Sequence, residues 1–70
     1  MTVLKTLREG KCLTLLDLTF QTKLRETELS SIENRRIKAF PKQRAALAGF
    51  YGVPEAELFD NDCFAREVSE

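Results

Sequence analysis

The chain has 70 residues, 43% of them hydrophobic and 31% charged, which is enough for one folded domain. This composition excludes a disordered chain, a collagen and a coiled coil. The net charge is zero, yet residues 1–51 hold ten Lys and Arg against five Asp and Glu, whereas residues 52–70 hold one Arg against six Asp and Glu. A basic body with an acidic tail indicates nucleic-acid contact, and the alternative is a solvated surface with a solubilising tail.

Other function classes are excluded by features that the sequence lacks. No apolar run approaches the roughly 20 residues of a membrane span, and the first residues do not resemble a signal peptide, so we expect a cytoplasmic protein with no membrane partner. Cys12 and Cys63 stand alone, without a CxxC pair or any histidine, and are interpreted as free thiols. We therefore expect no metal and no cofactor. No nucleophile motif or phosphate-binding loop occurs, so an enzyme is not expected.

The first half of the chain predicts three short helices. Residues 3–10 carry apolar side chains at helical spacing and end at Gly10. Thr14 begins a second helix, and Asp17 follows at the spacing of a capping box. A turn at residues 22–24 leads into a third helix, which runs from residue 25 or 26 to residue 34 with Leu29 and Ile32 pointing inward.

The second half predicts two more helices and a tail. Pro41 suits the first position of a fourth helix that ends before Gly52, and residues 54–59 form a short fifth helix. Residues 60–70 are an acidic tail in which Phe64 and Val68 are four residues apart. We expect this pair to form one amphipathic turn that docks on the helices. The alternative is that the tail lies across the basic surface and competes with phosphate.

One set of positions between residues 7 and 59 has the spacing of a known family: Leu7, Arg8, Leu13, Thr14, Asp17, Leu18, Leu24, Leu29, Ser30, Ile32, Glu33, Lys38, Leu47, Ala48, Gly52, Val53, Leu58 and Phe59. At these positions the chain resembles the phage-repressor family of helix-turn-helix proteins, which is also called Cro/repressor-like or XRE-type. The resemblance covers about three quarters of the chain without a gap. It implies an all-α fold, a compact five-helix bundle of the lambda-repressor-like DNA-binding type over residues 3–59, with the motif at about residues 14–34 and the third helix as the recognition helix.

Four positions depart from the family pattern. Leu15 replaces a Gln that contacts a backbone phosphate in the family, and Lys23 replaces the Gly of the turn. Thr19 replaces the Ala that allows the two helices to approach closely, and Arg44 occupies a core position of the fourth helix. The apolar spacing is intact, so these departures concern DNA binding more than the fold.

The resemblance also implies which residues contact DNA. Glu26, Thr27 and Ser31 match the base-reading positions of the recognition helix. A carboxylate accepts a hydrogen bond from cytosine, and a threonine offers a methyl and a hydroxyl group. The alternative for Glu26 and Glu28 is that they only compensate the helix dipole. The predicted DNA-binding residues are Arg25, Glu26, Thr27, Ser30 and Ser31, with Arg35, Arg36 and Lys38 as phosphate contacts in the following loop.

Three large apolar residues of the second helix, Leu15, Leu16 and Phe20, stand at positions that are normally polar and outward. Exposed apolar patches usually mark an interface, so we expect a protein-facing surface here. The alternative is that these side chains extend the core.

These observations lead to one principal function and one alternative. We expect a cytoplasmic DNA-binding transcription regulator, with repression as the expected mode, that acts as a homodimer on double-stranded DNA. The alternative is a helix-turn-helix fold used for protein binding through Leu15, Leu16 and Phe20, as in an antirepressor or an adaptor. An antitoxin would combine both functions, with the acidic tail contacting the toxin.

Overall fold

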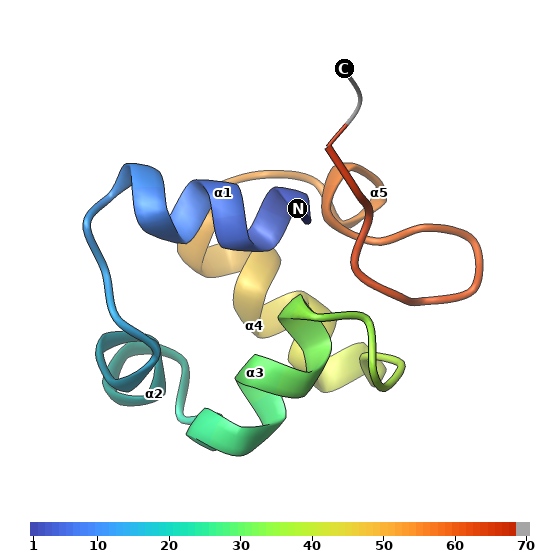
Figure 1. Ribbon diagram of the computed structural model, residues 1–70. Helices are drawn as coiled ribbons and strands as arrows, with labels where there is room; N and C mark the ends of the chain where they lie inside the picture. The colour runs from blue at the N-terminus through green and yellow to red at the C-terminus, as the bar shows by residue number, and fades with distance from the viewer. Residues whose placement is uncertain (69–70) are drawn as a thin grey trace.

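Five short helices follow one another in the computed structural model, which describes residues 1–68 (Figure 1). The predicted all-α class is confirmed, because the described residues contain two isolated β-bridges and no strand. The helix bounds agree closely with those predicted. The helices are α1 (Val3–Gly10), α2 (Leu15–Thr22), α3 (Glu26–Glu33), α4 (Pro41–Tyr51) and α5 (Glu55–Leu58).

The ends of the helices follow from local chemistry. The predicted capping box at the start of α2 is confirmed: Thr14 N donates to Asp17 Oδ2 at 2.9 Å, and Asp17 N donates to Thr14 Oγ1 at 3.1 Å. The hydrogen bonds from Thr14 lower the pKa of the Asp17 carboxyl. Pro41 begins α4, and Gly52 ends it in the left-handed region at a φ of 67°.

In Figure 1, α4 passes behind α1 and α3, and its residues Leu47 and Tyr51 belong to the buried core. One face of each helix supplies it, because apolar residues recur at the helical period. The side chains that are almost completely buried are Leu4, Leu18, Leu29, Ile32, Leu47 and Leu58.

A buried ion pair joins α1 to the end of α3. Arg8 Nε donates to both oxygens of Glu33, at 3.0 and 3.2 Å, and the Glu33 side chain is only 5% exposed. Arg8 also donates to the Leu13 carbonyl at 2.9 Å. The hydrogen bond to Glu33 raises the pKa of Arg8. Removing either partner would leave a buried charge without compensation, so this pair fixes the two helices to each other.

Arg44, which the resemblance placed at a core position, has polar partners for its guanidinium. Its Nε lies 3.2 Å from Glu55 Oε1 of α5, and its Nη1 donates to the Ala39 carbonyl. The charged group is therefore compensated at the edge of the core, and α4 is joined to α5.

The segment after α5 turns back along the molecule to reach the N-terminus. Phe59 and Ala65 form one antiparallel bridge, and Thr2 and Glu67 form another. Ala65 is fully buried. The segment is therefore part of the folded body as far as it is described, and residues 69 and 70 of the predicted acidic tail lie outside the described residues.

The amphipathic turn predicted for Phe64 and Val68 is wrong. Val68 N donates to the Met1 carbonyl at 2.9 Å, and Val3 N donates to the Arg66 carbonyl at 2.8 Å, so this part of the chain is extended. Backbone hydrogen bonds to the N-terminus satisfy the groups that a helical turn would have paired internally.

Candidate nucleic-acid interface

Helices α2 and α3 are joined by a three-residue turn in which Lys23 adopts the left-handed backbone region. Its φ is 65°, and its N–H donates to the Thr19 carbonyl at 3.0 Å, which ends α2. Leu24 follows and is buried in the core. Thr19 donates its hydroxyl to the Leu15 carbonyl at 3.2 Å. The hydroxyl group of Thr19 is therefore paired within α2.

The outer face of α3 borders an open hollow of about 310 Å³. Leu29 and Ile32 hold the opposite face of this helix in the core. The hollow brings together five of the eight predicted DNA-binding residues and one residue of α2. Its lining consists of Glu26, Thr27, Ser30 and Ser31 of α3, Arg36 of the following loop and Leu15 of α2.

The hollow offers several kinds of contact within a small area. Glu26 accepts hydrogen bonds, Arg36 donates them, and the hydroxyl groups of α3 do both. Leu15 contributes an apolar wall. The carboxylate, hydroxyl and apolar groups suit the edges of base pairs, which present donors, acceptors and the thymine methyl group in the major groove, and the guanidinium of Arg36 suits a phosphate.

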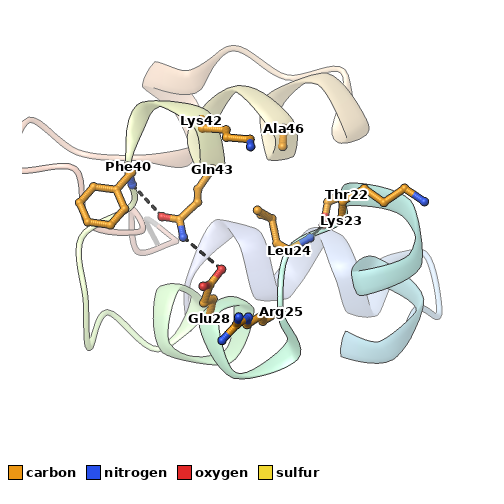
Figure 2. A pocket seen from close by; sticks show the side chains of 9 residues that line it. All are labelled: Thr22, Lys23, Leu24, Arg25, Glu28, Phe40, Lys42, Gln43 and Ala46. Carbon is orange, nitrogen blue, oxygen red and sulfur yellow. Dashed lines mark hydrogen bonds between the residues drawn. The ribbon is translucent and has the colours of Figure 1, made fainter.

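Arg25 lies elsewhere, beside a second hollow of about 330 Å³ between the α2–α3 turn and the start of α4 (Figure 2). Gln43 crosses this hollow: it accepts a hydrogen bond from Phe40 N at 2.8 Å and donates to Glu28 Oε2 at 3.4 Å (Figure 2). Glu28 is therefore directed towards α4. Only Glu26 of the predicted glutamate pair lies in the hollow on the outer face of α3.

Arg35 is bound to the C-terminal segment. Its guanidinium lies 3.1 Å from Asp60 Oδ2, 3.4 Å from Glu67 Oε1 and 5.8 Å from the centre of the Phe64 ring. Both carboxylates therefore compete with a phosphate for this guanidinium. The other two predicted phosphate contacts, Arg36 and Lys38, are exposed, and the ion pairs found in residues 1–68 do not involve them.

The three α2 residues of the predicted protein-facing surface do not share one environment. Leu16 and Phe20 are 54% and 70% exposed, as a protein-facing surface requires. Leu15 is half-buried and packs against the core, where it also borders the α3 hollow. The sequence did not predict that Phe40, at the start of α4, would be a further exposed aromatic residue, with 69% of its surface accessible. No periodic pattern marks it, because it lies in the loop.

No helix within residues 1–68 has both the length and the apolar character needed to cross a bilayer. In the same part of the chain, no three His, Cys, Asp or Glu side chains gather in a group able to hold a metal ion. Comparison with protein-family models, curated proteins and solved structures finds no match to this chain.

Proposed function

We propose that the protein is a DNA-binding transcription regulator of the lambda-repressor-like type, in which α3 enters the major groove of double-stranded DNA. The observation that carries this proposal is the hollow on the outer face of α3, where one carboxylate, three hydroxyl groups and one guanidinium converge. With eight residues, α3 is about 12 Å long, which is comparable to the width of the major groove. The ion pair between Arg8 and Glu33 anchors its far end.

The charges of the folded chain limit the strength of this interaction. Arg8, Arg35 and Arg44 are each paired with carboxylates of the protein, so the basic body has fewer free cations than its sequence suggests. Arg36 and Lys38 follow α3 and remain exposed. We expect these two residues to carry the phosphate contacts in the loop after α3.

The test is a fluorescence-anisotropy titration against duplexes selected by the protein from a random library, repeated over a range of salt concentrations. Each lost phosphate contact should reduce the slope of log affinity against log salt by about 0.9. Arg36→Ala and Lys38→Ala should each show this reduction. Arg35→Ala is the matched control and should leave the slope unchanged. Equal slopes for all variants would contradict the assignment, and a library without any enriched sequence would contradict the function itself.

A second candidate function is protein binding through α2, which the exposure of Leu16 and Phe20 favours. Because Phe20 is exposed, Phe20→Glu should keep the fold and the melting temperature while it removes an association. Light scattering on the wild type and the variant tests self-association in a homodimer. Leu18→Glu is the contrasting variant, since a carboxylate at this fully buried position should unfold the chain. A folded Phe20→Glu variant with unchanged mass and unchanged DNA affinity would contradict a role of this surface in dimerisation.

A further inference from the structure

Leu15 occupies an unusual place for a large apolar side chain. It is the first residue of α2, it packs against the core, and it also forms part of the wall of the hollow on the outer face of α3. The other residues that line this hollow are polar or charged. Leu15 therefore differs from Leu16 and Phe20, whose side chains are mostly exposed to solvent.

A leucine at this position cannot hydrogen-bond a phosphate or the polar edge of a base. In the major groove, the apolar group presented by a base pair is the methyl group on C5 of thymine, and 5-methylcytosine presents the same group. Thr27 lines the same hollow and carries a second methyl group. The hollow therefore has apolar surface on α2 and α3, next to polar groups suited to the rest of the base edge.

We propose that Leu15 is a specificity-determining residue that recognises the C5-methyl group of a pyrimidine, with thymine as the base in the preferred site. This inference rests on the proposed DNA-binding function and adds to it the class of base that the hollow reads. Packing against the core holds Leu15 in place before DNA arrives. Little side-chain freedom is then lost on binding, so the methyl contact contributes to discrimination.

The experiment begins with the duplex that the wild-type protein selects from a random library. Each thymine of that duplex is replaced in turn by deoxyuridine, which removes only the methyl group. At one position the wild-type affinity should fall about fourfold, the factor expected for burial of one methyl-sized group. A cytosine placed at that position should bind more tightly when it is methylated at C5, which tests the methyl group independently of thymine.

Protein variants then assign the effect to Leu15. Leu15→Ala and Leu15→Gln should bind the thymine and deoxyuridine duplexes equally well. The glutamine variant retains the length of the side chain in case alanine weakens the core. Leu13→Ala is the matched control, because Leu13 is also half-buried against the core but does not line the hollow, and this variant should retain the fourfold preference.

The results separate this inference from the function on which it depends. Enrichment of a sequence, followed by equal affinity for all deoxyuridine duplexes, would overturn the role of Leu15 and leave DNA binding intact. The same conclusion would follow if both Leu15 variants, shown to be folded by circular dichroism, kept the preference for thymine. A library that yields no enriched sequence would overturn the proposed function and this inference together.

Discussion

Tyr51 carries a buried hydroxyl group that has no hydrogen-bond partner among the described residues. Burial and the nearby charge of Glu33 raise the pKa of this hydroxyl from 10.0 to about 12. Between pH 10 and 12 the unfolded chain therefore binds fewer protons than the folded one, and stability falls as the pH rises. Tyr51→Phe should remove this alkaline loss, which amounts to at most about 1.4 kcal/mol per pH unit. Denaturant unfolding of the wild type and the variant below and above pH 10 measures this loss of stability.

At neutral pH, Tyr51→Phe should leave the free energy of unfolding unchanged or raise it by up to about 1 kcal/mol. The variant removes a polar group that is buried without a partner, and the ring that packs against Phe50 at a centroid distance of 5.0 Å is retained. Parallel stability curves for the two proteins across the alkaline range would contradict the buried, neutral state of the hydroxyl.

The turn between α2 and α3 holds Lys23 at a φ of 65°, a conformation that costs a residue with a Cβ roughly 1 kcal/mol. Lys23→Gly removes that strain, although glycine also gains freedom in the unfolded chain. We expect a net stabilisation of about 0.5 kcal/mol, or a few degrees in melting temperature for a domain of this size. Thermal melting followed by circular dichroism measures the change.

Lys11, at the end of α1, provides the matched control for this turn. Its φ is −96°, so glycine relieves no strain there and only increases the entropy of the unfolded chain. Lys11→Gly should melt at or below the wild-type temperature. If both glycine variants melt below the wild type, the left-handed conformation of Lys23 is not a source of strain.

The segment after α5 joins the two ends of the described chain, because it forms backbone hydrogen bonds with the N-terminal residues. Deletion of residues 60–70 removes Ala65 from the core and exposes Phe59, which is now 3% exposed. It also removes the backbone hydrogen bonds to Met1 and Val3. We expect the deletion to lower the melting temperature markedly. For the fraction that remains folded, it should also strengthen DNA binding at low salt, because it removes the carboxylates of Asp60 and Glu67 from Arg35. Circular dichroism melting and an anisotropy titration measure the two quantities.

Glu67→Gln is a milder change in the same segment. It removes one exposed partner of Arg35 and keeps the backbone bridge to Thr2, so stability should change by less than about 1 kcal/mol. One result of the deletion experiment would contradict the expected gain in DNA affinity. If the deletion leaves DNA affinity unchanged at low salt, Asp60 and Glu67 do not compete with phosphate for Arg35.

The helices were predictable because their signals act over a few residues. The Thr14–Asp17 capping box, Pro41 at the start of α4 and Gly52 at its end each appear in the structure as predicted. Such signals depend on side chains and backbone groups within one helical turn of each other. Lys23 adopts the left-handed conformation at the turn position where the resemblance implies a glycine.

The candidate site was predictable only in part. Four predicted DNA-binding residues of α3 line one hollow because residues three to four apart share a helix face, and Arg36 joins them from the following loop. Glu28 and Arg35 have other partners, and those partners are distant in the sequence. Gln43 is 15 residues from Glu28, and Asp60 is 25 residues from Arg35. No pattern along the chain indicates such a pairing.

The sequence by itself determined the class of fold, the positions of five helices and the exposed face of α3, since periodicity and capping are local. Only the tertiary structure decided which arginines pair with carboxylates, that the chain after α5 is extended, and that Leu15 borders the α3 hollow. The physical reason is that ion pairs, bridges and hollows form between groups that folding brings together. Their free energy depends on distance and burial in space rather than on spacing in the chain.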